Sequence, residues 1–193
     1  MGAHAGENPF RVERMHGIRY WDPALDWEQL LTRLEALGWR ASLVGKHGQG
    51  KTTLLLELGE RLKAQGHGVE HLIVGDENRV QSTLEPRGDT IYLIDGVERL
   101  EPMAWLAFRW RLREAKGAVI TAHHPGRMPT LYLCRSTPAT IAYLLRELVP
   151  EDAEALSERI PRFFDEHRGD CRKVLFALYD EYAGRGPNGG SPA

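Results

Sequence analysis

Eight consecutive residues match a pattern that binds phosphate groups in proteins. Positions 45–52 read GKHGQGKT, which fits GxxxxGK[ST]. Glycines in such a loop let successive backbone N–H groups turn toward phosphate oxygens, and the positive end of the following helix adds to the attraction. The candidate phosphate-binding residues are Gly45, Lys46, His47, Gly48, Gln49, Gly50, Lys51, Thr52 and Thr53.

Thr52 in this loop and Asp95 further along the chain have the chemistry of metal ligands. The ammonium group of Lys51 would reach the β and γ phosphates of a nucleotide, and the hydroxyl of Thr52 would help to hold Mg²⁺. Asp95 ends the apolar run 91–94. A buried parallel strand delivers such a carboxylate to the carboxyl edge of its sheet, beside the phosphates. We therefore predict that Thr52 and Asp95 hold Mg²⁺ next to a bound nucleotide.

The elements that must position these residues alternate along the chain. Helical patterns begin after Asp22-Pro23, at Lys51 and at Pro102, and the last of them continues to residue 116. Short apolar runs predict five strands, at 41–44, 69–74, 90–94, 118–121 and 130–134. Strands separated by helices or long crossovers indicate an α/β fold, in which helices cover both faces of a parallel sheet.

Beyond the last predicted strand the pattern becomes entirely helical. Helices are predicted near 138–148, 151–168 and 170–183. We therefore expect an α/β core over 9–137 and a small helical lid over 138–183. Residues 1–8 are expected to be flexible, and the Gly- and Pro-rich residues 184–193 to form a disordered tail.

The composition excludes several classes of protein. The 193 residues include 25 Lys plus Arg and 27 Asp plus Glu, a net charge of −2, so bulk charge gives no support for nucleic-acid binding. No apolar run is long enough to cross a membrane, and the first residues lack the pattern of a signal peptide. Two isolated cysteines, Cys134 and Cys171, argue against a zinc site or a disulfide framework. We expect a cytoplasmic protein without membrane contact.

With these motifs the chain resembles the AAA+ and STAND-type ATPases. The resemblance implies ATP as the nucleotide, a sheet order of 5-1-4-3-2 and a C-terminal helical lid. Thr121, at the end of the fourth predicted strand, falls where this family has a residue that senses the γ-phosphate. Arg127, before the fifth strand, falls where an arginine acts on the nucleotide of a neighbouring subunit, which would require oligomers.

Two further segments carry the same resemblance. Residues 169–175 resemble the lid motif GDxRxxL, which would make Arg172 a second sensor of the nucleotide. Residues 8–10, Asn-Pro-Phe, resemble the segment that lines the adenine pocket in this family.

One departure from the family concerns hydrolysis. Active members usually carry a glutamate directly after the magnesium-binding aspartate, but this chain has Gly96. A phosphoryl-transfer enzyme without a water-orienting carboxylate keeps its binding and charge stabilisation but loses much of its rate. Glu98 could replace the missing group if Gly96 bends the chain, and it could equally be a solvated turn residue. Asp76 and Glu77, after the predicted edge strand, are poorer candidates.

Two other segments have both a chemical and a structural interpretation. His123 and His124 are interpreted as loop histidines near the nucleotide rather than metal ligands. Residues 105–113 interleave aromatic residues with arginines, which could suit nucleic acid or a protein partner. The spacing of Leu106 and Trp110 favours a helix that packs these two residues on the sheet.

We therefore expect an ATP-binding ATPase of this type, with slow Mg²⁺-dependent hydrolysis coupled to a partner protein or to self-assembly. Its candidate catalytic residues are Glu98, Thr121, Arg127 and Arg172. One alternative is an ATP-dependent switch or scaffold with little or no hydrolysis, which Gly96 favours. A small-molecule kinase is a second alternative, although its lid helices usually interrupt the α/β core.

Overall fold

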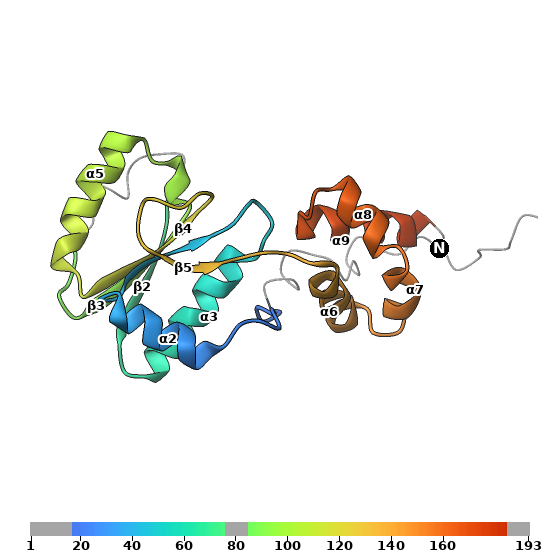
Figure 1. The fold of residues 1–193 in the computed structure, drawn as a ribbon, viewed down its shortest axis with the longest axis horizontal. Coiled ribbons are helices and arrows are strands. Elements are labelled where there is room, and N and C mark those ends of the chain that lie inside the picture. Colours follow the sequence, from blue (N-terminus) through green and yellow to red (C-terminus); the bar gives the residue numbers. More distant parts are fainter. Residues whose placement is uncertain (1–16, 76–84, 185–193) are drawn as a thin grey trace, which may run out of the picture. The chain divides into compact units, whose positions relative to one another are not determined.

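The computed structural model describes residues 17–75 and 85–184, which form two compact units. The first unit, residues 23–135, contains a five-stranded sheet with the order β2-β3-β4-β1-β5, in which all neighbours are parallel (Figure 1). This confirms the α/β fold and the predicted order. The strands are β1 (Arg40–Val44), β2 (Gly68–Ile73), β3 (Thr90–Asp95), β4 (Gly117–Ala122) and β5 (Thr130–Leu133).

The sheet brings the carboxyl ends of its central strands to one edge. In the parallel register Val44 at the end of β1 pairs with Ala122, and Ile94 in β3 pairs with Ile120. All six residues of β4 are buried, as are five of the six in β3, because both strands have neighbours on each side and helices on each face. Segments that leave β1, β3 and β4 therefore start close together.

The helices of this unit are α2 (Trp27–Ala36), α3 (Lys51–Ala64) and α5 (Pro102–Arg111), and α5 covers the opposite face of the sheet from α2 and α3 (Figure 1). The prediction that α2 starts after Asp22 is wrong. Asp26 caps the helix instead, because its Oδ1 accepts hydrogen bonds from the backbone N–H groups of Glu28 (2.9 Å) and Gln29 (3.1 Å). Short 3-10 turns, η1 (Val97–Arg99) and η2 (Leu112–Glu114), flank α5.

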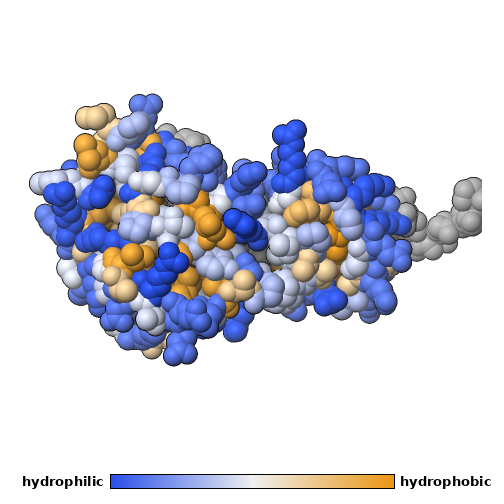
Figure 2. All heavy atoms as spheres, viewed as in Figure 1, coloured by the Kyte–Doolittle hydropathy of each residue, from blue (hydrophilic) through white to orange (hydrophobic). Residues whose placement is uncertain are grey.

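Helix α5 packs on the sheet through a different face from the one predicted. Trp105 and Phe108 are buried there, whereas Leu106 is 57%, Trp110 64% and Met103 77% exposed. The prediction that Leu106 and Trp110 pack on the sheet is therefore wrong, since an equally regular spacing three residues apart forms the buried face. Figure 2 shows hydrophobic residues reaching the surface among hydrophilic ones.

The second unit, residues 136–184 with the described part of 1–22, is helical. Its helices are α6 (Pro138–Leu148), α7 (Ala153–Ser157), α8 (Ile160–Glu166) and α9 (Cys171–Gly184). The prediction of a single helix over 151–168 is wrong, because the helix is interrupted between α7 and α8. Pro161 lies in the first turn of α8, where a helix needs no backbone N–H donor. Ile18, predicted within the core segment 9–137, packs against the helical cluster instead.

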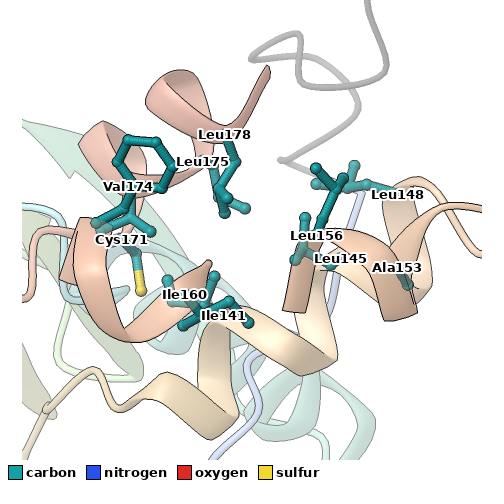
Figure 3. Close-up of a cluster of buried hydrophobic side chains, with 11 residues drawn as sticks. Ile141, Leu145, Leu148, Ala153, Leu156, Ile160, Cys171, Val174, Leu175 and Leu178 are labelled. Carbon is teal, nitrogen blue, oxygen red and sulfur yellow. The ribbon is translucent and has the colours of Figure 1, made fainter. Parts of the chain in front are cut away.

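A hydrophobic core holds the four helices together (Figure 3). Burial raises the pKa of the Cys171 thiol to about 11, so it packs there as a small uncharged group. Cys134, the other cysteine, is also buried. The cluster consists of Ile141, Leu145, Leu148, Ala153, Leu156, Ile160, Phe163, Cys171, Val174, Leu175 and Leu178.

Replacing Leu175 with alanine is expected to destabilise the helical unit by about 2–5 kcal/mol. The side chain is fully buried in this cluster, so its removal leaves a cavity as well as lost apolar contact. Chemical denaturation followed by circular dichroism measures the change. Phe176→Ala is the matched control, because the neighbouring ring is 38% exposed and its loss is expected to cost less. Equal destabilisation by both variants would contradict the packing of α9.

None of the helices in the described part of the chain combines the length and apolar character needed to cross a membrane.

Candidate phosphate-binding site

The loop between β1 and α3 is held tightly against the neighbouring strands. The backbone N–H of Gly45 donates to the carbonyl of Ala122 (3.1 Å). A side chain at this position would not fit, because a Cβ on Gly45 would lie 2.7 Å from the carbonyl oxygen of Cys134. Within the loop, Gln49 Oε1 accepts from the backbone N–H of Lys46 (2.7 Å). The loop is therefore shaped by its own side chains and by the ends of β4 and β5.

Lys51, the first residue of α3, is a buried cation at this loop. Its side chain is only 8% exposed, and Nζ donates to the carbonyl of Lys46 (2.8 Å). Burial lowers the pKa of Lys51, and the negative charges of Glu98 and Asp95 partly oppose this effect. A buried ammonium beside the N-terminus of a helix is well placed for an anionic ligand, which would satisfy the charge better than one carbonyl does.

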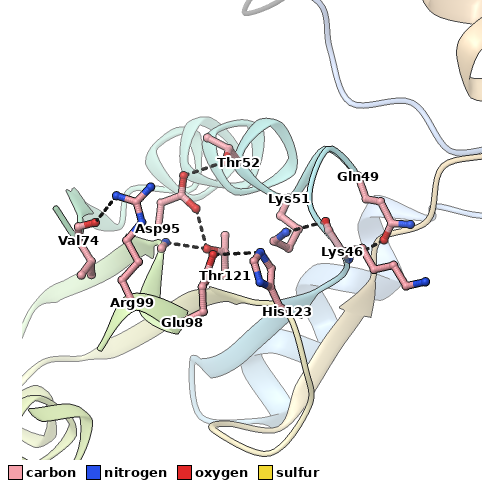
Figure 4. A network of polar contacts seen from close by, with 11 residues as sticks. Lys46, Gln49, Lys51, Thr52, Val74, Asp95, Glu98, Arg99, Thr121 and His123 are labelled. Carbon is pink, nitrogen blue, oxygen red and sulfur yellow. Dashed lines mark hydrogen bonds and ion pairs between the residues drawn. The ribbon is translucent and has the colours of Figure 1, made fainter. Parts of the chain in front are cut away.

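Asp95 connects three elements at the carboxyl edge of the sheet (Figure 4). Its Oδ2 accepts a hydrogen bond from Thr52 Oγ1 (2.7 Å) in α3, and its Oδ1 accepts one from Thr121 Oγ1 (2.6 Å) in β4. The structure thus brings together the two predicted metal ligands. A carboxylate and a hydroxyl beside a phosphate-binding loop are the oxygen ligands that suit Mg²⁺, so the residues present fit this ion.

Thr121 is fully buried, and its hydroxyl is used twice within the protein. Besides donating to Asp95, Oγ1 accepts from the backbone N–H of Gly96 (2.9 Å). In this structure Thr121 therefore orients the Asp95 carboxylate. Contact with a γ-phosphate stays a prediction.

Gly96 turns the chain back toward the site directly after β3. Its φ of 83° lies in the left-handed region that favours glycine, and it starts the η1 turn, in which Val97 is buried and Glu98 follows. Glu98 Oε1 lies 3.2 Å from His123 Nε2 (Figure 4). The bend that the sequence required of Gly96 is therefore present, and Glu98 lies in the polar network rather than in a fully solvated turn.

The contact between Glu98 and His123 was not predicted from the sequence. The sequence gives no direct signal for it, because His123 lies just beyond the end of β4 and Glu98 lies in a turn. The ring of His123 also lies 6.3 Å, between centroids, from that of His47 in the loop.

The two candidate arginines have different surroundings. Arg127 Nη2 donates to the carbonyl of Leu100 (2.8 Å), and its guanidinium lies 5.3 Å from the ring centroid of Trp105. A role on a neighbouring subunit would require Arg127 to leave these contacts. Arg172 is exposed in the first turn of α9, where Asp170 Oδ1 accepts from its backbone N–H (3.1 Å).

Some predictions lie outside the described residues. These are the adenine-pocket segment 8–10, the poorer acidic candidates Asp76 and Glu77, the flexible segment 1–8, and residues 185–193 of the predicted tail.

Comparisons with known proteins show a likeness in structure but not in sequence. No protein-family model matches the chain, and no curated protein matches it in sequence. The fold is similar to that of a DNA replication initiation factor, with a TM-score of 0.55 at 16% identity, over 79% of this chain and 58% of that one. It is also similar to domain III of the replication initiation protein DnaA from Thermotoga maritima, with a TM-score of 0.53 at 15% identity, over 86% of this chain and 85% of that domain.

At 16% and 15% sequence identity, the likeness to these two structures establishes the fold alone. This chain spans less than two thirds of the length of the replication initiation factor.

Proposed function

We propose that this chain is an AAA+-type module that binds ATP with Mg²⁺ and hydrolyses it slowly, in steps coupled to a partner protein or to self-assembly. The observation that carries the proposal is the 2.7 Å hydrogen bond between Thr52 in α3 and Asp95 at the end of β3, beside the buried ammonium of Lys51. These three groups supply a cation for phosphate and two oxygen ligands for a metal.

The fold supports the same proposal. The sheet order and the phosphate loop are those expected from the resemblance to AAA+ ATPases, and the similar structures belong to replication initiation proteins. In the proposed roles the loop residues 45–53 cradle the phosphates and Thr121 acts through Asp95. Arg172 would act on the nucleotide from the helical unit, and Arg127 would act in an oligomer.

Glu98 is the proposed water-orienting base. In this step the oxygen of a water forms a bond to the γ-phosphorus and the bond to the β,γ-bridging oxygen breaks, which releases ADP. The proton of the water passes to the Glu98 carboxylate and then to the inorganic phosphate. Glu98 raises the pKa of Lys51 more than any other charge does, which supports its position near the phosphate-binding cation.

Replacing Glu98 with glutamine is expected to slow phosphate release by about a hundredfold, the lower end of what a positioned base contributes. ATP affinity should change little, because an amide of the same shape keeps the packing. Steady-state phosphate release and equilibrium ATP binding measure the two effects. Glu101→Gln is the matched control, since this exposed carboxylate precedes α5 and contributes no side-chain cap to it.

The outcomes of this experiment separate the candidate functions. A parent protein that binds ATP but releases no phosphate above the background of a Lys51 variant would contradict hydrolysis and favour the ATP-dependent switch, whereas a parent with a measurable rate no faster than that of Glu98→Gln would show that Glu98 is not the base. Gly96 is the observation that favours this second function, because it removes the usual glutamate. Phosphorylation of an added small-molecule acceptor would favour a kinase.

A further inference from the structure

Glu98 has one carboxylate oxygen in use and one without a partner. Oε1 contacts His123 Nε2 at 3.2 Å, whereas Oε2 is buried and has no hydrogen-bond partner among the described residues. Burying an unpaired carboxylate oxygen costs free energy, so such a group in a folded protein needs an explanation. Oε2 lies on the carboxylate that interacts with the Lys51 charge, and a small shift of the side chains around it would admit one water to this unpaired acceptor.

His123 lies between Glu98 and the phosphate loop. It directly follows β4, two residues after Thr121, whose hydroxyl donates to Asp95. The imidazole of His47, in the loop, lies 6.3 Å from the ring of His123 between centroids. The turn that carries Glu98 is itself tied to β4 by the hydrogen bond from Gly96 to Thr121 (2.9 Å). Both members of the Glu98–His123 pair are thus anchored to the same strand.

We propose that His123 is a positioning residue for Glu98: its Nε2–H holds Oε1, which fixes the carboxylate so that Oε2 accepts the hydrogen bond of the attacking water. Through this contact Glu98, three residues after Asp95, takes the role of the glutamate that usually follows such an aspartate directly. The inference rests on the proposed ATPase function. His123 forms no bond to the substrate and acts only through Glu98.

The charge state of His123 suits this role. Burial lowers the pKa of His123 more than the negative charge of Glu98 raises it, and Lys51, His47 and His124 lower the pKa further. The imidazole is therefore neutral near pH 7, with one N–H to donate. A neutral donor can hold Oε1 without placing a positive charge beside the carboxylate.

A double-mutant cycle on the full chain tests the inference. Phosphate release and ATP affinity are measured for the parent, His123→Ala, Glu98→Gln and the double variant. We expect His123→Ala to lower kcat by about tenfold, as for the loss of one hydrogen bond to a charged group, and to leave ATP affinity within about twofold. In the Glu98→Gln background the same substitution should lower kcat by less than about twofold.

Two further variants separate positioning from a structural effect. His123→Gln keeps an N–H donor at a similar distance and is expected to recover most of the lost rate, which a merely structural defect would not predict. His71→Ala is the control, because this exposed histidine lies on the edge strand β2 and should leave the rate unchanged. Thermal melts verify that each variant is folded.

Each remaining outcome overturns the inference in a distinct way. An unchanged rate in His123→Ala, an equal loss in both backgrounds, or a loss of ATP affinity instead of kcat would show that His123 does not act through Glu98. If the parent binds ATP but releases no phosphate above the background of a Lys51 variant, Glu98 has no reaction to serve and the inference fails, while ATP binding stands. Failure to bind ATP would instead overturn the proposed function itself.

Discussion

Replacing Lys51 with methionine is expected to weaken ATP binding by about a thousandfold. The ammonium would make charge-assisted hydrogen bonds to two phosphate groups, each contributing about 1.5–3 kcal/mol. The only hydrogen bond described for this ammonium is the one to the Lys46 carbonyl at 2.8 Å, so little structure depends on the charge. Methionine has a similar length and fills the same buried space. Isothermal titration calorimetry with Mg²⁺ and ATP measures the change in affinity.

The same substitution is expected to leave the empty protein at least as stable as the parent. Burial lowers the pKa of Lys51 in the folded chain below its value in the unfolded chain, so the folded state binds fewer protons between these two values. The free energy of unfolding attributable to Lys51 therefore falls as the pH is lowered from the alkaline range through this window, and the cost of the buried cation is fully present below it. Lys51→Met removes that cost, which thermal melts at a pH of about 7 would detect.

Lys63→Met is the matched control for both measurements. It places the same substitution on the same helix, α3, at an exposed lysine that pairs with Glu60 at 2.9 Å. An exposed ion pair of this kind contributes little, so affinity and melting temperature should stay close to those of the parent. Full ATP affinity in Lys51→Met would show that the loop does not bind the phosphates as proposed.

Much of the α/β unit could be predicted because its signals are local. The apolar runs in β3 and β4 are buried on both faces, and such strands read as continuous hydrophobic stretches. The prediction failed where two local signals compete. Leu106 and Trp110 form one regular stripe on α5, while Trp105 and Phe108 form another, and only the packing against the sheet selects between them. Asp22 and Asp26 compete in the same way for the start of α2.

The candidate site was predictable in its residue types but not in its contacts. The loop pattern and the position of Asp95 at a strand end predict a meeting of α3 and β3, which the bond from Thr52 shows. The contact between Glu98 and His123 joins a turn after β3 to the residue after β4, and no sequence spacing encodes how far a turn bends. The left-handed conformation of Gly96 determines this bend, and a glycine in the sequence does not by itself specify which conformation it adopts.

Replacing Asp95 with asparagine is expected to slow phosphate release by about a thousandfold and to abolish the tightening of ATP binding by Mg²⁺. Asparagine keeps the shape of the side chain but loses the negative charge that a divalent cation requires. It also has an NH2 donor in place of one of the two carboxylate oxygens that accept from the Thr52 and Thr121 hydroxyls (2.7 and 2.6 Å), so one of these threonines must accept instead of donating. Replacing one carboxylate oxygen with an amide nitrogen is therefore expected to weaken both the proposed metal site and the link between α3 and β4.

Measuring ATP affinity with Mg²⁺ and with a chelator separates these effects. In the parent, Mg²⁺ should strengthen binding, whereas in Asp95→Asn the two affinities should agree and match that of the parent with chelator. Asp89→Asn is the control, because this exposed carboxylate precedes the opposite end of β3 and bonds only to Thr90 Oγ1 (3.0 Å) among the contacts described. If Mg²⁺ still strengthens binding to Asp95→Asn as much as to the parent, the metal ligands lie elsewhere, since a site built on Thr52 and Asp95 has no other carboxylate to hold the ion.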